Sequence, residues 1–138
     1  MTSSPRVQPL ILVADHEQTL LEEVMAALTA SGFACRCCTT AEQALTEADR
    51  LLPDLILADT NLQGDSGMEM WQLLQQNPRL ADVPTMFLSG MQIPDIIRRN
   101  NGARGSYYLR KPFAAEVLIE LIDTALQRSR LQVAAAGQ

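Results

Sequence analysis

The amino-acid sequence predicts an α/β fold, a doubly wound and mostly parallel sheet of five strands with helices on both faces. Short apolar runs of strand length alternate along the chain with longer segments in which apolar residues recur at helical spacing. Proline, glycine and asparagine separate the two kinds of segment. The 138 residues, of which 47% are hydrophobic and 20% charged, are enough for one globular domain but not for two.

Five apolar runs are the expected strands. Each is bounded by turn residues, and the runs cover residues 10–14, 33–38, 55–58, 85–88 and 107–110. In the second run, Cys35 and Cys37 share one face with Phe33 by strand alternation. We expect the cysteines, Cys38 included, to be small core residues in a reducing compartment. A zinc site would need ligands beyond these and the single histidine, His16.

The longer segments predict the helices. Their apolar residues recur every three or four positions, and they cover residues 18–30, 40–52, a stretch after Gly67, a short helix around 95–99, and 115–126. Thr39 is the expected cap of the second helix, because Glu42 completes a capping box three residues later. In the third helix, Met68, Trp71 and Leu74 are spaced to face the sheet.

These elements predict a flavodoxin-like sheet with the strand order 2-1-3-4-5, because right-handed crossovers join parallel strands. This order places the carboxyl ends of the first, third, fourth and fifth strands in one row. Those ends carry Asp15, Asp59, Ser89 and Lys111. Ligands of open α/β sheets bind in the crevice at this edge, so we expect the functional site there.

Two carboxylates, a hydroxyl and an ammonium group suit one divalent cation and one phosphoryl group. Carboxylate oxygens are the hard ligands that Mg²⁺ prefers. A carboxylate also acts as a nucleophile toward a phosphoryl donor once a cation offsets the charge repulsion. Lys111 is the single lysine beside ten arginines, at a position where a compact point charge suits a phosphoryl oxygen better than a guanidinium fork.

Four motifs, each at a predicted strand end, make the chain resemble the receiver domains of the two-component response-regulator family. The motifs are Ile-Leu-Val-Ala-Asp15, Pro-Asp-Leu-Ile-Leu-Ala-Asp59 with Gly67 eight residues later, Pro84-Thr-Met-Phe-Leu-Ser89-Gly90, and Tyr108-Leu-Arg-Lys111-Pro112-Phe113. The resemblance covers residues 9–127, which we expect to form the receiver domain. Residues 1–8 are then a flexible N-terminal segment, and residues 128–138 a C-terminal tail or the start of a linker.

The resemblance implies that Asp59 accepts a phosphoryl group from a sensor histidine kinase or a phosphotransfer protein. Asp15, Asp59 and the backbone carbonyl of Asn61 would hold Mg²⁺. Lys111 would bind the phosphoryl group, and the Lys111–Pro112 peptide bond would be cis. Such a domain is a signalling module that assists its own phosphorylation and dephosphorylation rather than an enzyme.

The resemblance also implies a switch and an output surface. Ser89 would bind the new phosphoryl oxygen, and Tyr108 would move into the space that Ser89 leaves. The surface formed by the helix around 95–99, the strand 107–110 and the last helix would contact an output domain, a partner protein or a second copy of the chain. Arginines concentrate on that surface, at positions 98, 99, 104 and 110.

Composition excludes other classes of function. The net charge of -5 argues against direct nucleic-acid binding, which normally requires a basic excess. No apolar run has the length of a membrane span, and the N-terminus lacks the apolar centre of a signal peptide. We therefore expect a cytoplasmic protein.

One position departs from the family pattern. His16 stands where the family usually has a second acid after the first strand, the acid that touches the metal. Imidazole suits transition metals better than Mg²⁺, so we expect weaker Mg²⁺ binding, with His16 or Glu17 as further ligands and a softer ion such as Mn²⁺ in competition. The substitution leaves open a pseudo-receiver that binds partners without phosphorylation. A small enzyme or flavin carrier is disfavoured, because residues 15–19 would repel a phosphate.

Overall fold

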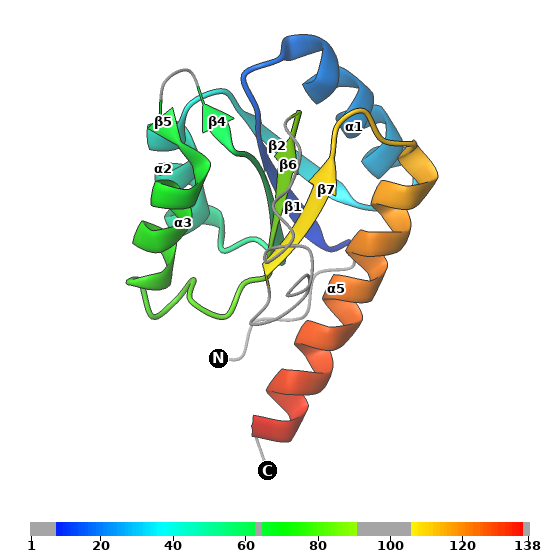
Figure 1. Cartoon of the computed structure of the whole chain (residues 1–138). Coiled ribbons are helices and arrows are strands. Elements are labelled where there is room, and N and C mark those ends of the chain that lie inside the picture. Colours follow the sequence, from blue (N-terminus) through cyan, green and yellow to red (C-terminus); the bar gives the residue numbers. More distant parts are fainter. Residues whose placement is uncertain (1–7, 63–64, 91–105, 137–138) are drawn as a thin grey trace.

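The computed structural model describes residues 8–62, 65–90 and 106–136 and contains a five-stranded parallel sheet (Figure 1). The strand order is β2-β1-β3-β6-β7, which confirms the predicted order. Its strands are β1 Leu10–Ala14, β2 Ala34–Cys38, β3 Leu55–Asp59, β6 Thr85–Ser89 and β7 Ser106–Arg110. A short antiparallel pair follows β3, formed by β4 Asn61–Leu62 and β5 Asp65–Ser66. The sequence pattern does not predict this pair.

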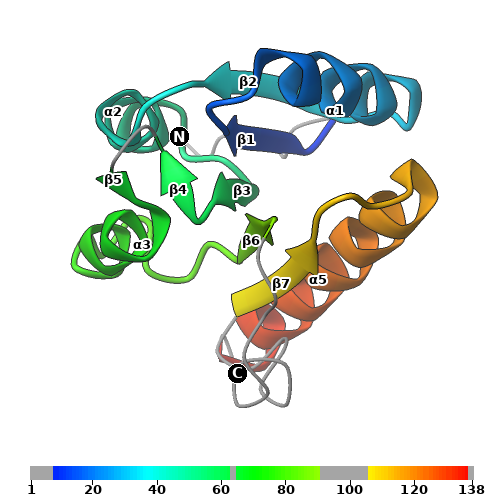
Figure 2. The ribbon, with the colours of Figure 1, turned by 45° about the horizontal axis from the view of Figure 1, so that its top comes forward.

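Helices cover both faces of the sheet, with α1 and α5 on one face and α2 and α3 on the other (Figure 2). They are α1 Gln18–Ala30, α2 Ala41–Leu51, α3 Gly67–Gln75 and α5 Ala115–Ala136. The helix expected around 95–99, with the arginines at 98, 99 and 104, lies outside the described residues. None of the helices in the described ranges combines the length and apolar character that a membrane crossing requires.

The sheet separates two hydrophobic clusters. On β1, Ile11 and Val13 pack toward α1 and α5, whereas Leu12 and Ala14 pack toward α2 and α3. All four side chains are at most 1% exposed, as expected for a central strand covered on both faces. Full burial of one such leucine or isoleucine contributes about 1.5–3 kcal/mol, so this alternation is what holds the helices on the sheet.

Helix α2 is capped by Thr40, and the prediction of Thr39 as its cap is wrong. The Thr40 side chain accepts a hydrogen bond from the Gln43 N–H at 3.1 Å, and the Gln43 amide oxygen accepts one from the Thr39 N–H at 3.1 Å. The cap therefore lies one residue later than predicted, and Gln43 rather than Glu42 supplies the side chain that reaches back, to the N–H of the residue before the cap. Two adjacent threonines followed by Glu-Gln fit the same sequence pattern in either register.

Replacing Thr40 by alanine is expected to lower the free energy of unfolding by about 1 kcal/mol, the usual cost of losing a helix cap. Urea denaturation measures the change. Thr46→Ala is the matched control, because Thr46 is exposed in the middle of α2 and alanine is the better helix former there. An equal loss in both variants would show that the Thr40 cap contributes nothing specific.

The structure completes the prediction for α3 and corrects that for α5. Met68, Trp71 and Leu74 all pack on the cluster that faces the sheet, as predicted, and Met70, which the prediction omitted, is buried there as well. Helix α5 runs to Ala136, so the predicted end near Leu126 is wrong. The segment that follows Leu126 contains no proline and no glycine before position 137, and its residues are good helix formers, so nothing in it stops the helix.

Candidate functional site

The carboxyl edge of the sheet brings together the acids predicted from the sequence. Asp15 follows β1 directly and is fully buried, and Asp59 ends β3 and is 3% exposed. Strands β1 and β3 pair in parallel with Ala14 opposite Ala58, so the two aspartates are the next residues on neighbouring strands. Ser89 ends β6 and is buried, and Lys111 follows β7. All four residues therefore lie at the edge where the sequence places them.

Lys111 lies among three carboxylates. Its Nζ is 2.8 Å from Asp15 Oδ2, 3.3 Å from Asp59 Oδ2 and 3.3 Å from Glu17 Oε1. Burial alone would lower the pKa of Lys111, but the contact with Asp15 and the charges of Asp15 and Asp59 raise it overall. Its backbone N–H donates to the Ser89 carbonyl at 2.7 Å, and the Lys111–Pro112 peptide bond is cis, the form that the resemblance implies. The ammonium group is thus held, charged, over the acids.

The two oxygens of Asp59 have different surroundings. Oδ1 accepts a hydrogen bond from the Asn61 N–H at 3.2 Å, on the short strand β4. Oδ2 is 2.6 Å from His16 Nδ1 and 3.3 Å from Lys111 Nζ. One oxygen is therefore fixed by the backbone, and the other faces nitrogen groups from two other strand ends.

Helix α3 begins against the backbone of Asp59. The Gly67 N–H donates to the Thr60 carbonyl at 3.0 Å, and a Cβ built on Gly67 would overlap the Asp59 carbonyl oxygen and lie 3.1 Å from its carbon. The Ser66 side chain caps the helix by accepting a hydrogen bond from the Glu69 N–H at 3.3 Å. Only a residue without a side chain allows this approach, so Gly67 fixes the turn that carries Asp59.

His16 contacts Asp59 directly, which sequence reasoning did not predict. Besides the 2.6 Å contact, its Nδ1 is 3.7 Å from Asp15 Oδ1, and its Nε2 is 4.0 Å from Glu17 Oε1. The side chain is 38% exposed, so it lies at the mouth of the site. The predicted strand order could have indicated this contact. His16 comes one residue after Asp15 at the end of β1, and β3, which ends at Asp59, is the neighbouring strand.

The acids fit a divalent cation. Ligand atoms of Asp15, His16 and Glu17 lie within 4.8 Å of one another. Asp15 Oδ2 is buried, and the group it contacts among the described residues is the Lys111 ammonium group at 2.8 Å. Burial raises the pKa of Asp15, and the charge of Asp59 adds to this, against the contacts with Lys111 and the Glu17 N–H that lower it. A cation that prefers oxygen ligands would offset the free-energy cost of burying these two carboxylate charges side by side.

The expected switch residues lie on neighbouring strands. Tyr108 is opposite Phe87 in the β6–β7 register, and its ring stacks on Phe87 with centroids 5.3 Å apart and planes at 26°. Phe87 also meets Trp71 edge to face at 6.2 Å. Tyr108 is partly buried against the cluster under α2 and α3, and Ser89 is the second residue after Phe87. An aromatic row therefore connects β7, β6 and α3 next to the site.

A flavodoxin-like sheet with two acids, a hydroxyl and one lysine at the ends of four strands defines a class of protein, the signalling domains of two-component systems. A family model described as response regulator receiver domain matches residues 11–123 of the chain. The chain belongs to this family. It is a receiver domain of a two-component response regulator, a signalling module.

Individual relatives agree with this assignment. The chain is 29% identical over 119 residues to the phosphate regulon transcriptional regulatory protein PhoB of Pseudomonas aeruginosa, a match of 86% of this chain and 52% of PhoB. The chain thus spans about half the length of the PhoB relatives and 19% of the protein RcaC of Microchaete diplosiphon. The structure of NtrX from Brucella abortus in complex with ATP has a TM-score of 0.82 at 26% identity, over 94% of this chain and 29% of that one.

The chemotaxis response regulator CheY4 of Vibrio cholerae has a TM-score of 0.77 at 21% identity and covers 86% of this chain and 99% of its own. At this identity, the likeness shows the fold alone. It supports the five-stranded arrangement described above.

Proposed function

We propose that this receiver domain accepts a phosphoryl group on Asp59 from a sensor histidine kinase or a phosphotransfer protein. One observation carries the proposal: Asp59 is nearly buried at a strand end, with Oδ1 held by a backbone N–H and Oδ2 3.3 Å from the ammonium group of Lys111. In the transfer, an Asp59 oxygen attacks phosphorus, the bond between phosphorus and the donor atom breaks, and the leaving group keeps the electron pair. The product is an aspartyl phosphate.

The other residues of the edge have supporting roles. Asp15, Asp59 and the backbone carbonyl of Asn61 would hold Mg²⁺, which supplies positive charge against the repulsion between carboxylates and phosphoryl oxygens. Lys111 binds a phosphoryl oxygen as a point charge, from a position that already balances Asp15 and Asp59. The Ser89 hydroxyl, buried at the end of β6, donates to another phosphoryl oxygen. The domain thereby assists its own phosphorylation and dephosphorylation.

Phosphorylation would then bias two arrangements of Ser89 and Tyr108. Tyr108 is only partly buried and packs through its ring on Phe87, so inward movement would bury more of the ring. The face formed by β7 and α5 would pass the change to an output domain, a partner protein or a second copy of the chain. The name of PhoB as a transcriptional regulatory protein, and its greater length, support an output domain as the partner.

A pseudo-receiver is the second candidate function, and one observation favours it. His16 Nδ1 lies 2.6 Å from Asp59 Oδ2, so an imidazole contacts the same oxygen that faces Lys111. If this contact persists in the presence of a phosphoryl donor, Asp59 is protected, and the domain binds partners without phosphorylation. The two candidates differ in whether His16 leaves Asp59 when a cation and a donor arrive.

Incubation with Mg²⁺ and acetyl phosphate is expected to add one phosphoryl group to the parent and none to an Asp59→Ala variant. Intact-mass measurement detects the addition, and peptide mapping locates it. The physical reason is that Asp59 is the acid that Lys111 and a backbone N–H orient toward the edge of the sheet.

A His16→Asp variant separates the two candidate functions. Addition to this variant but not to the parent would overturn the phosphoacceptor function and establish the pseudo-receiver. Addition to the parent and equally to Asp59→Ala would show that another residue is the acceptor. No addition to the parent or to His16→Asp would contradict the proposal altogether.

A further inference from the structure

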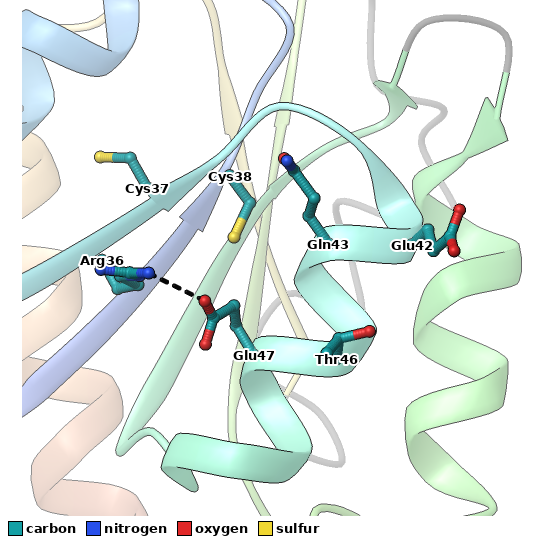
Figure 3. Close-up of a pocket in the computed structure, with 7 residues that line it drawn as sticks. All are labelled: Arg36, Cys37, Cys38, Glu42, Gln43, Thr46 and Glu47. Carbon is teal, nitrogen blue, oxygen red and sulfur yellow. Dashed lines mark hydrogen bonds and ion pairs between the residues drawn. The ribbon is translucent and has the colours of Figure 1, made fainter.

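Strand β2 carries three cysteines, and the structure places them in two different environments. Cys38 is 4% exposed in the cluster under α2 and α3, with its sulfur directed toward α2, whereas the sulfur of Cys37 points away from that helix (Figure 3). Cys35 and Cys37 are half-buried on the opposite face, beside Phe33, as the alternation predicts. The expectation of core cysteines therefore holds for Cys38, while the other two are partly open to solvent.

The sulfur atoms of Cys35 and Cys37 are in contact at 3.8 Å. The pKa of Cys37 is lowered to about 7 by its hydrogen bond with the Cys35 thiol and by the positive charge of Arg36, against burial that raises it. The pKa of Cys35 is raised by the same hydrogen bond and by burial, and burial raises that of Cys38 to about 11. A thiolate, which is the reactive form of cysteine, is stabilised on one member of this pair by the thiol of the other, and the charge of Arg36 favours Cys37.

We propose that Cys37 is a site of reversible oxidation by peroxides and that Cys35 is its resolving thiol. A partly exposed thiol in contact with a second thiol is the arrangement found in redox-responsive cysteines. The pair lies on β2, which is one of the two edge strands of the described sheet and pairs with β1 alone. The backbone of an edge strand adjusts more readily than that of a strand paired on both sides, because fewer hydrogen bonds constrain it.

The chemistry takes two steps. The Cys37 thiolate attacks one oxygen of the peroxide, the O–O bond breaks, and the sulfur becomes a sulfenic acid while a hydroxide leaves. The Cys35 sulfur then attacks the Cys37 sulfur, the S–O bond breaks, and water forms with the Cys35 proton. In sum, two thiols lose two electrons and two protons, and one molecule of hydrogen peroxide is reduced to two molecules of water.

A disulfide between Cys35 and Cys37 requires β2 to bend locally, because the side chains of alternate strand residues run parallel, whereas a disulfide brings the two Cβ atoms to within about 3.5–4.5 Å. Strand alternation excludes a disulfide with Cys38. Alternate residues of a strand have Cα atoms about 6.6 Å apart on the same face. This lies near the upper end of the range of about 4.4–6.8 Å seen in disulfides. Cys38 points to the other face of the sheet. Its carbonyl accepts a hydrogen bond from the Asp15 N–H at 3.1 Å, so the oxidised segment adjoins the phosphorylation site.

Exposure of the reduced chain to a small excess of hydrogen peroxide tests the proposal. After quenching with N-ethylmaleimide under denaturing conditions, the parent is expected to carry one maleimide, on Cys38, and an intramolecular disulfide between Cys35 and Cys37. Dithiothreitol is expected to restore three alkylable cysteines. Peptide mapping separates these changes from methionine oxidation.

Single serine variants identify the role of each thiol, and circular dichroism checks that each remains folded. Cys38→Ser is expected to form the disulfide at the rate of the parent. Cys35→Ser is expected to accumulate a sulfenic acid on Cys37 that dimedone traps. Cys37→Ser is expected to react at least about tenfold more slowly, since an ordinary thiol is mostly protonated at neutral pH.

Three results would overturn the proposal. They are a disulfide that includes Cys38, a Cys37→Ser variant that oxidises as fast as the parent, and a parent that forms only disulfides between chains. If Cys37→Ser does not fold, the Cys35→Ser variant still tests the proposal. An absence of sulfenic acid on Cys37 in the Cys35→Ser variant would contradict the role of Cys37 as the oxidised thiol.

Discussion

A His16→Asp variant is expected to bind Mg²⁺ roughly tenfold or more tightly than the parent, the size of effect that a single group at a metal site usually has. In the parent, the imidazole lies 2.6 Å from Asp59 Oδ2 and 3.7 Å from Asp15 Oδ1, so it contacts the acids that the cation needs. A carboxylate in its place removes this contact and adds a hard oxygen ligand. Imidazole, by contrast, favours transition metals over Mg²⁺.

Isothermal titration calorimetry with Mg²⁺ and with Mn²⁺ measures both parts of this expectation. The ratio of Mn²⁺ to Mg²⁺ affinity is expected to fall in His16→Asp, because the nitrogen ligand is lost. His16→Asn is the control, since it removes the imidazole without adding a charge. Equal Mg²⁺ affinities in the parent and His16→Asp would contradict the role given to His16.

A Gly67→Ala variant is expected to lose about 3 kcal/mol of unfolding free energy, at the upper end of the cost of overpacking. The added Cβ would overlap the carbonyl oxygen of Asp59 and lie 3.1 Å from the Thr60 Cα, and backbone atoms cannot move aside as a flexible side chain can. Alanine at the start of α3 would favour the helix by about 1 kcal/mol over glycine. The clash outweighs this gain, so the net effect is destabilising.

Gly90→Ala is the matched control for this variant. A Cβ at Gly90 meets no heavy atom of the described residues within 4 Å, and the residue lies beside Ser89 at the same edge of the sheet. Its unfolding free energy is expected to stay within about 0.5 kcal/mol of the parent, as for most surface substitutions. Urea denaturation of both variants measures the difference. Equal stability of Gly67→Ala and the parent would show that α3 does not pack on the Asp59 backbone as described.

The apolar pattern predicts the sheet well, because each strand is a short apolar run with clear stops. Strand β1 covers the predicted residues 10–14, and the acids at the strand ends follow from topology. Helices are less well determined. The apolar side chains of α3 occur almost all round the helix, so spacing alone did not identify Met70 as the buried residue. In α5, the residues at 127–136 contain no proline or glycine that would stop the helix, so the predicted end near Leu126 had no local signal behind it.

The site is only partly predictable for a different reason. The sequence places Asp15, Asp59, Ser89 and Lys111 at one edge, because side chains at the ends of parallel strands have few alternatives. The direction of His16 depends on side-chain contacts with Asp59 that no periodicity encodes. Strand alternation predicts that Cys37 and Cys38 lie on opposite faces of β2. It does not predict which of the two is partly exposed, because that depends on how closely α1 and α2 cover the strand.

The single lysine of the chain makes the site addressable by isotope labelling. Lys111 has an 11% exposed side chain, and its Nζ contacts Asp15, Asp59 and Glu17. A sample grown on ¹⁵N- and ¹³C-labelled lysine contains one labelled side chain, so its magnetic resonance spectrum reports from the centre of the site alone. Cation binding and phosphoryl transfer can then each be followed on one side chain, without assignment of the remaining residues.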